Sequence, residues 1–177
     1  MSTIIETNRL ILRTFRATDW QDFYEYFSDK EVLKFEPFKP FTEEECKEEV
    51  IHRSTNPDFI AVCLKNTGKL IGNLYFAEGD FITWEVGYVF NSKFHGQGYA
   101  TESVKAIINY AFSTLDARRI VAMCDPKNNP SWKLLERIHM RREGHLLQNI
   151  YFFEDKDRKP IWKDTYEYAI LANEWKF

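Results

Sequence analysis

The segment Phe94–Glu102 constrains the fold most, because it joins two different periodic patterns through two glycines. It reads Phe-His-Gly-Gln-Gly-Tyr-Ala-Thr-Glu, after an apolar strand pattern that ends at Phe90 and before a helical pattern over Ala100–Leu115. Gly96 and Gly98 allow the backbone to approach a ligand closely. The first amides of a helix are unpaired, and the helix dipole favours negative charge there. A strand, a glycine turn and a helix start together predict an anion-binding loop, most often used for phosphate groups.

The spacing of this loop excludes two common phosphate-binding motifs. A dinucleotide-binding fingerprint needs a third glycine at the position that Thr101 occupies. A Walker loop needs Gly-Lys followed by Ser or Thr, and that sequence does not occur in the chain. The structural alternative is a surface turn that only caps the helix.

The sequence His95-Gly96-Gln97-Gly98-Tyr99-Ala100 resembles the pyrophosphate-binding loop of the GNAT superfamily of N-acetyltransferases, whose pattern is Arg/Gln-x-x-Gly-x-Gly/Ala. His95 departs from this pattern, because the first position normally holds Arg or Gln. The resemblance implies that these six residues and Thr101 bind the co-substrate acetyl-coenzyme A. His95 either adds positive charge beside the pyrophosphate or lies exposed in the loop.

A second stretch, Asn128-Asn129-Pro130-Ser131, resembles the Asn-x-x-Ser/Ala helix of the same superfamily. Many members carry a Tyr four residues after the Ser/Ala position as general acid, whereas this chain has Leu135. The resemblance implies that Asn128 binds the pantetheine amides and that Ser131 donates a hydrogen bond, or relays a proton, to the departing thiolate. The alternatives are that Ser131 caps the helix and that Asn128 merely begins the turn before Pro130.

The two ends of the chain resemble one branch of that superfamily, the ribosomal-protein (RimJ/RimL-type) N-acetyltransferases. The matching segments are Thr7–Arg13 and Asp164–Trp175, and this branch carries a Ser at the position of Ser131. One departure is His139-Met140, which replaces the usual Gly-Phe after the Ser131 helix. A glycine there normally ends the helix in a left-handed conformation, so we expect a remodelled corner.

Glu85 is the candidate general base. It lies within Trp84–Val89, an otherwise apolar strand, where a carboxylate is out of place unless something uses it. Partial burial raises the pKa of a carboxyl group, which can then draw a proton from an ammonium ion. The resemblance supports this role, since Glu precedes the same Val-Gly-Tyr segment in the ribosomal-protein branch. The alternatives are a solvent-facing Glu or one paired with a lysine.

The same resemblance implies that the pantetheine arm lies along this strand. Val89 and Phe90 are the positions whose backbone would pair with it, and one of their amides would polarise the thioester carbonyl. Both residues are alternatively ordinary core residues of the strand.

Composition places the chain among globular proteins with one domain over residues 1–177. The net charge of −3 argues against nucleic-acid binding. No signal pattern and no apolar run near 18 residues is present, so we expect a cytoplasmic protein without a membrane segment. The three cysteines, Cys46, Cys63 and Cys124, are expected to be buried thiols. No histidine has metal-ligand spacing, so no metal is expected.

Hydrophobic periodicity predicts an α+β fold. The resemblance implies that this is the GNAT fold, a mixed, mostly antiparallel central sheet of about seven strands flanked by about four helices. Capping boxes at Thr18 and Thr42 begin the first two helices, the second of which ends near Thr55. The other predicted helices cover 100–115 and 131–139, and the predicted strands cover 9–15, 59–64, 70–76, 81–90, 119–124, 143–153 and 161–171.

The sequence therefore predicts an enzyme that moves the acetyl group of acetyl-coenzyme A to a primary amine by direct transfer. The acceptor is either a protein N-terminus or a small-molecule amine. The alternatives are a non-catalytic coenzyme A sensor or scaffold and, third, a nucleotide-binding regulatory domain. The aromatic loop Phe35–Phe41 lines an acceptor pocket or rests on the core. The segment Tyr151–Phe153 has the same two alternatives, or it forms a homodimer interface.

Overall fold

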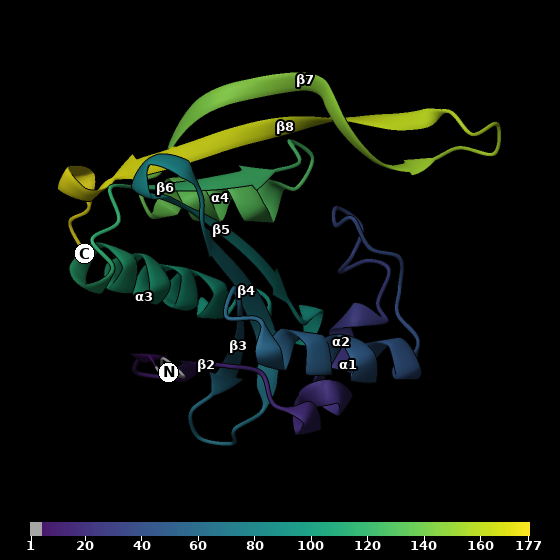
Figure 1. Cartoon of the computed structure of the whole chain (residues 1–177), viewed down its shortest axis with the longest axis horizontal. Coiled ribbons are helices and arrows are strands. Elements are labelled where there is room, and N and C mark those ends of the chain that lie inside the picture. Colours follow the sequence, from purple (N-terminus) through teal and green to yellow (C-terminus); the bar gives the residue numbers. More distant parts are fainter. Residues whose placement is uncertain (1–4) are drawn as a thin grey trace.

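The computed structural model describes residues 5–177, which form an eight-stranded sheet with helices on both faces (Figure 1). The strand order is β1-β2-β3-β4-β5-β6-β8-β7, and every neighbouring pair is antiparallel except β5 and β6. The strands are β1 (Ile5–Glu6), β2 (Leu10–Arg13), β3 (Phe59–Leu64), β4 (Leu70–Glu78), β5 (Thr83–Phe90), β6 (Arg119–Cys124), β7 (Arg141–Glu154) and β8 (Pro160–Leu171). The α+β class and the mostly antiparallel sheet are confirmed. The additional strand is β1, which is too short to show a period-2 pattern in the sequence.

Helices α1 (Trp20–Phe27) and α2 (Glu43–Thr55) begin differently, although both were expected to begin with a capping box. At α2, Thr42 Oγ1 accepts from the Glu45 amide at 3.3 Å and Glu45 Oε2 accepts from the Thr42 amide at 2.7 Å, as predicted. The expectation for Thr18 is wrong, because Thr18 lies inside a 3-10 turn over Ala17–Asp19. Asp19 closes that turn instead, by accepting from the Arg16 amide at 2.7 Å.

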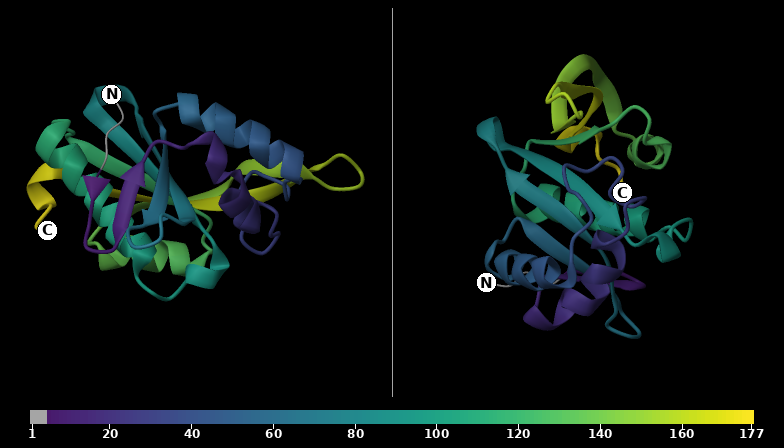
Figure 2. Two further views of the ribbon diagram at one scale, coloured as in Figure 1. Left: turned by 90° about the horizontal axis from the view of Figure 1, so that it is seen from below. Right: turned by 90° about the vertical axis from the view of Figure 1, so that its right-hand side faces the viewer.

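The two helix pairs cover opposite faces of the sheet (Figures 1 and 2). The helices α3 (Tyr99–Thr114) and α4 (Asn129–Arg137) belong to the larger core, where Ile107, Ile108 and Leu135 are fully or almost fully buried. The helices α1 and α2 form a second core, rich in aromatic side chains, on the other face. Strand β4, between the two cores, is therefore mostly buried.

Strands β5 and β6 separate soon after they meet. They pair only from Thr83 to Glu85, against Arg119–Val121. Beyond that point β5 stays paired with β4 as far as Phe90, while β6 stays paired with β8 as far as Cys124. The sheet therefore opens between these two strands, and Glu85 is the last residue of β5 that pairs with β6.

Two boundaries differ from the predicted ones for backbone reasons. The strand expected over 81–90 begins at Thr83, because Phe81 and Ile82 have positive φ (58° and 55°) that a strand does not accommodate. The helix expected over 131–139 is α4, which begins at Asn129, with Pro130 in its first turn. Proline suits that position because its missing N–H has no helical partner there.

His139 takes the left-handed position that a glycine would normally occupy after α4. Its φ is 66°, and the His139 and Met140 amides donate to the Glu136 and Leu135 carbonyls at 3.0 Å each. This is the hydrogen-bond pattern of a Schellman motif. The corner is therefore not remodelled, and the imidazole stacks on the ring of Phe177, with the ring centroids 5.2 Å apart.

Candidate active site

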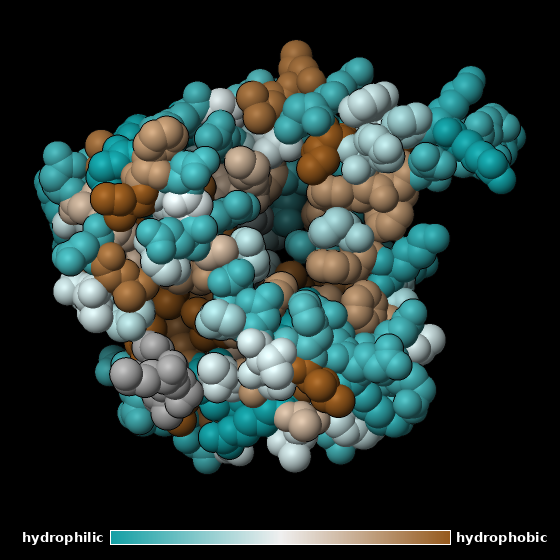
Figure 3. All heavy atoms as spheres, viewed as in Figure 1, coloured by the Kyte–Doolittle hydropathy of each residue, from teal (hydrophilic) through white to brown (hydrophobic). Residues whose placement is uncertain are grey.

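A cavity of about 1410 Å³ passes through the opening between β5 and β6. Its surface opening lies beneath the β7–β8 hairpin, where the space-filling view is hollowed (Figure 3). The cavity is bordered by β5, the glycine loop, the start of α4, the α1–α2 loop and the hairpin. Of the predicted site residues it is lined by Val89, Phe90, His95, Gly96, Gly98, Tyr99, Ala100, Thr101, Asn128 and Ser131.

The glycine loop presents a row of amides to the cavity. Gly96 and Gly98 have φ of 73° and 82°, and Gly98 is the residue that precedes α3. Within residues 5–177, the amides of residues 96–101 have no hydrogen-bond partner. The dipole of α3 adds partial positive charge at the same place. The loop therefore has the geometry of an anion site.

Arg9 connects the glycine loop to the first turn of α3, a role that sequence reasoning did not assign. Its guanidinium pairs with Glu102 at 2.6 Å and donates to the Gln97 carbonyl at 3.0 Å. The Thr7 hydroxyl donates to the same Glu102 carboxylate at 2.6 Å. The N-terminal segment thus fixes the first turn of α3, and its signal in the sequence is the Thr-Asn-Arg that opens the chain's first strand pattern.

Two loop residues use their side chains within the fold. His95 Nε2 donates to the Phe90 carbonyl at 2.9 Å, which ties the loop to the end of β5. The Gln97 side chain donates to the Lys93 carbonyl at 3.3 Å and does not line the cavity. The backbone amides of this loop and the start of α3 therefore remain available to a ligand.

Three cations, which the sequence reasoning missed, line the cavity near the loop. They are Lys105 on α3 and Lys133 and Arg137 on α4. Arg137 Nη1 donates to Thr101 Oγ1 at 3.2 Å, so the guanidinium lies beside the first turn of α3. Exposed cations around unpaired amides suit a ligand with several phosphate charges.

The free edge of β5 borders the opening. Two backbone hydrogen bonds lie at the two ends of the β4–β5 pairing. The Gly79 amide donates to the Thr83 carbonyl at 2.8 Å, and the Asn91 amide donates to the Ile71 carbonyl at 3.0 Å. Since strand residues alternate, odd-numbered residues of β5 direct their backbone groups to β4. Tyr88 and Phe90 therefore direct their backbone groups to the opening. Val89, one of the two positions predicted to pair with the pantetheine arm, directs its backbone groups to β4.

Ser131 lines the cavity and contacts a tyrosine that sequence reasoning missed. Its Oγ is 3.0 Å from Tyr88 Oη, which also donates to the Ser131 carbonyl at 2.9 Å. Because α4 begins at Asn129, Ser131 is not the helix cap. Burial raises the pKa of Tyr88, so the phenol stays protonated at neutral pH.

Asn128 immediately precedes α4 and also lines the cavity. Its backbone begins the turn, as the structural alternative expected, because its carbonyl accepts from the Ser131 amide at 3.1 Å. Its carboxamide makes no cap bond and has no hydrogen-bond partner in the described chain. The side chain is therefore available to a ligand.

Glu85 lies at the point where β5 and β6 part, but it does not line the cavity. Burial raises the pKa of its carboxyl group, as expected for a carboxylate in an apolar strand. Its side chain alternates with that of Tyr88 and so lies on the other face of β5. From this position, a proton that moves between the Glu85 carboxylate and the cavity has to pass through water molecules.

The aromatic segments divide between cavity and core. Phe35 and Phe152 line the cavity, whereas Phe38 and Phe41 pack on the second core. Tyr151 is exposed and lies against Trp162, with the ring centroids 5.4 Å apart. Within the α1–α2 loop, Phe35 therefore borders the cavity, while Phe38 and Phe41 rest on the core.

The remaining chemistry of the chain is simple. The three cysteines are free thiols: Cys46 and Cys63 are buried, and Cys124 is partly exposed at the cavity, with its pKa raised by burial to about 11. Across residues 5–177, no group of three or more His, Cys, Asp or Glu side chains is arranged to hold a metal ion. No helix in this range is long and apolar enough to cross a membrane.

Comparison with known proteins places this geometry in a family. The acetyltransferase (GNAT) domain family matches residues 9–141. The uncharacterized N-acetyltransferase YnaD of Bacillus subtilis is 40% identical over 176 residues, which cover 97% of this chain and 98% of YnaD. The ribosomal protein uS5-alanine N-acetyltransferase of Escherichia coli is 25% identical, covering 97% of this chain and 92% of that protein.

A solved structure agrees with the sequence relatives. The crystal structure of a GNAT-family acetyltransferase from Bacillus anthracis matches with a TM-score of 0.89 and 36% identity, covering 97% of this chain and 100% of that chain. The chain therefore belongs to the GNAT family of acetyltransferases, and it is an acyl-coenzyme A-dependent N-acetyltransferase.

Proposed function

We propose that this enzyme transfers the acetyl group of acetyl-coenzyme A directly to a primary amine, with both substrates bound in the one cavity. The observation that carries this proposal is the opening between β5 and β6. It connects the glycine loop to the α1–α2 loop, so a thioester and an amine entering from the two sides meet beside Ser131. Holding two reactants in register supplies much of the rate enhancement in such reactions.

The residues present fit coenzyme A. The amides of residues 96–101, with Lys105, Lys133 and Arg137 nearby, suit its phosphates. The unpaired edge of β5 at Tyr88 and Phe90 and the free carboxamide of Asn128 suit the amides of the pantetheine arm. When bound, acetyl-coenzyme A supplies the thioester. The chain supplies the hydrogen bonds that place it.

Ser131 and Tyr88 are placed to serve the departing thiolate. A serine hydroxyl is a poor acid at neutral pH, so Ser131 donates a hydrogen bond or relays a proton and does not hold one. The short contact with Tyr88 Oη gives the relay a second hydroxyl that stays protonated at neutral pH. This pair stands in for the tyrosine that many relatives carry at the position of the fully buried Leu135.

Replacing Ser131 with Ala is expected to lower kcat by about 100-fold and to leave the KM for acetyl-coenzyme A nearly unchanged. The reason is that the hydroxyl acts on charge that develops only as the carbon–sulfur bond breaks. Steady-state thiol release measures both constants. Ser54→Ala, which removes an exposed hydroxyl on α2, is the control. An unchanged kcat in Ser131→Ala would assign the relay to another group.

Glu85 is the base that the sequence predicts, and from its position it can act only through water. That hypothesis predicts that Glu85→Gln lowers kcat by about 100-fold while the Kd for coenzyme A stays unchanged. Calorimetric binding and single-turnover kinetics measure the two quantities separately. Full activity of Glu85→Gln would reject a base role at this position.

An assay with a panel of amines would identify the class of the acceptor. Thiol release from acetyl-coenzyme A is measured against N-terminal peptides, polyamines and aminoglycosides, with coenzyme A affinity measured in parallel. The uS5-alanine N-acetyltransferase among the relatives favours including ribosomal-protein N-termini. Turnover identifies the acceptor, and tight binding without turnover of any amine would favour the non-catalytic sensor.

A further inference from the structure

The α1–α2 loop places a second carboxylate, Glu36, directly in the cavity. Glu36 lines the cavity beside Phe35 and is only partly accessible to solvent. Within residues 5–177, its carboxylate makes no hydrogen bond and no ion pair, although an unpaired charge is costly to bury. A partly buried, unpaired carboxylate at a substrate cavity is complementary to a cation that the free protein does not supply.

The cations nearest to Glu36 are committed to other carboxylates. Lys163, which reaches the cavity from β8, pairs with Asp125 at 2.8 Å. Arg53, from α2, pairs with Glu49 at 2.6 Å. Burial raises the pKa of Glu36 to about 7, and the more distant charges of Lys163 and Arg53 lower it only in part. Glu36 is therefore close to half ionised at neutral pH.

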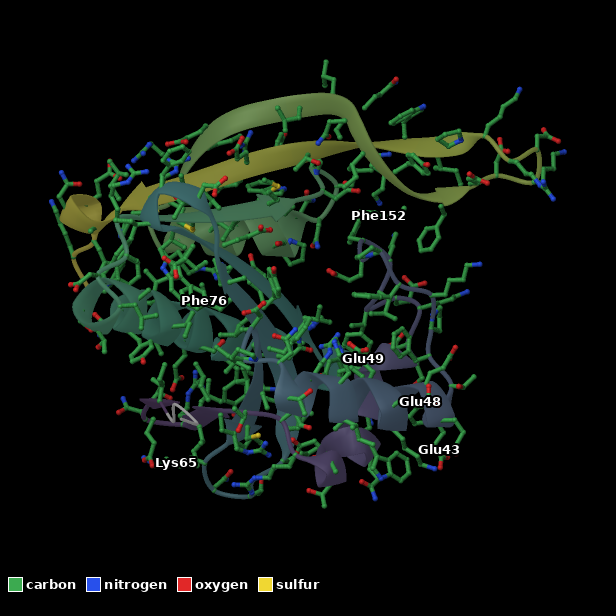
Figure 4. All side chains as sticks on the ribbon, in the orientation of Figure 1. Glu43, Glu48, Glu49, Lys65, Phe76 and Phe152 are labelled. Atoms are coloured by element: carbon green, nitrogen blue, oxygen red, sulfur yellow. The ribbon has the colours of Figure 1, made fainter. Side chains whose placement is uncertain are left out.

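Glu36 shares the cavity with the hydroxyl pair of Tyr88 and Ser131. All three residues line it, and the hydroxyl oxygens of Tyr88 and Ser131 lie 3.0 Å apart. The rings of Phe35 and Phe152 both lie 5.6 Å from Lys163 Nζ, so they border the same part of the cavity. Figure 4 shows Phe152 on the hairpin, above the α1–α2 loop. Aromatic rings beside an unpaired, partly buried carboxylate suit an ammonium group on an apolar stem.

We infer that Glu36, rather than Glu85, binds the ammonium group of the acceptor and takes its proton. The inference rests on the proposed function and names the acceptor class as a primary amine that arrives as a cation. The first proton passes from nitrogen to the Glu36 carboxylate, which frees the lone pair. The nitrogen–carbon bond then forms and the carbon–sulfur bond breaks. The second amine proton ends on sulfur by way of Ser131, and Glu36 returns its proton to solvent.

The decisive comparison is between Glu36→Gln and Glu85→Gln, assayed with acetyl-coenzyme A at saturation and the best amine of the panel. Glu36→Gln is expected to lower kcat/KM for the amine by about 100-fold or more. It is also expected to lose the rise of kcat/KM through about pH 7 that wild-type enzyme shows as Glu36 ionises. Glu48→Gln, the same charge change at an exposed residue of α2 outside the cavity lining, is the matched control, with a change of less than about threefold.

A measurement without substrate tests the buried charge itself. The pKa of Glu36 is raised in the folded protein, so its contribution to stability is fully present below the ordinary pKa of a glutamate and is lost as the pH rises through about 7. The melting temperature of Glu36→Gln should therefore exceed that of wild type by an amount that grows between about pH 5 and pH 8. Adding n-butylamine at pH 8 should raise the melting temperature of wild type more than that of Glu36→Gln.

These results separate the inference from the proposed function. If wild type acetylates no amine, the proposed function fails, while the melting temperatures still report on Glu36. The inference is overturned if Glu36→Gln keeps the wild-type pH profile and Glu85→Gln loses it, or if the melting temperatures of Glu36→Gln and wild type stay parallel. An unchanged Kd for coenzyme A in Glu36→Gln shows that the variant is folded.

Discussion

Replacing Gly98 with Val is expected to raise the dissociation constant for coenzyme A by about 10- to 100-fold. Gly98 has a φ of 82°, a conformation that a β-branched residue does not adopt without strain. The added Cβ would touch Arg9 Nη2 at 3.4 Å, an ordinary van der Waals contact, so the backbone conformation is the main cost. The loop relieves this strain by turning its amides, and each lost charge-assisted hydrogen bond removes about 1.5–3 kcal/mol.

The hairpin between β3 and β4 offers a matched control for this variant. Gly68 has a φ of 75°, and a side chain there would meet no atom within 4 Å. Gly68→Val therefore carries the same backbone strain, of about 1–2 kcal/mol, at a place far from the cavity lining. Both variants should lower the midpoint of urea unfolding, and calorimetry should show weaker coenzyme A binding only for Gly98→Val. Equal Kd values for the two variants would contradict the assignment of the loop.

The local elements of this fold follow from the sequence because their causes are local. The capping box at Thr42 and the strand over 59–64 depend on neighbouring residues and on a period that holds for a few residues. The same is true of the glycine loop, whose positive φ values follow from the residue type. Thr18 has a similar pattern, yet the carboxylate of Asp19 closes that turn. The sequence alone does not show which of these two candidate caps is used.

The reacting end of the cavity was harder to predict, because it depends on where two strands part. Glu85 and Tyr88 belong to the same strand, and a period of two puts them on opposite faces. Only the departure of β6 toward β8 decides that Tyr88 borders the opening and Glu85 does not. That departure is set by a long-range pairing, which no local pattern encodes.

Glu36, in the α1–α2 loop, could not be predicted from local sequence patterns for the same reason. In the sequence it is one acid among the aromatic and proline residues of 35–41, and acids in loops are normally solvated. In the folded protein it lines the cavity, and β8 and α2 carry Lys163 and Arg53, whose charges act on it without pairing with it. A carboxylate of this kind is recognised only once the surrounding elements are in place.

Replacing Asp19 with Ala is expected to lower the free energy of unfolding by about 3–5 kcal/mol. Asp19 and Arg13 form a buried bidentate pair, with two hydrogen bonds of 2.8 Å, and their side chains are only 8% and 9% exposed. Removing the carboxylate leaves the Arg13 guanidinium buried without a counter-charge and also frees the Arg16 amide. Urea unfolding measures the loss. Asp19→Asn keeps the shape and some hydrogen bonds and should fall between wild type and Asp19→Ala.

An exposed ion pair supplies the comparison that isolates burial as the cause. Glu43 pairs with Lys47 at 2.9 Å on the surface of α2, with its side chain 53% exposed, and Glu43→Ala should change the free energy of unfolding by less than about 1 kcal/mol. The Asp19 turn leads directly into α1, and α1 carries the loop that presents Phe35 and Glu36 to the cavity. Asp19→Ala should therefore weaken acceptor use even at temperatures where the variant is folded, measured as a higher KM for the amine with an unchanged Kd for coenzyme A. Equal losses of stability for the buried and the exposed pair would show that burial does not set the strength of the Arg13–Asp19 interaction.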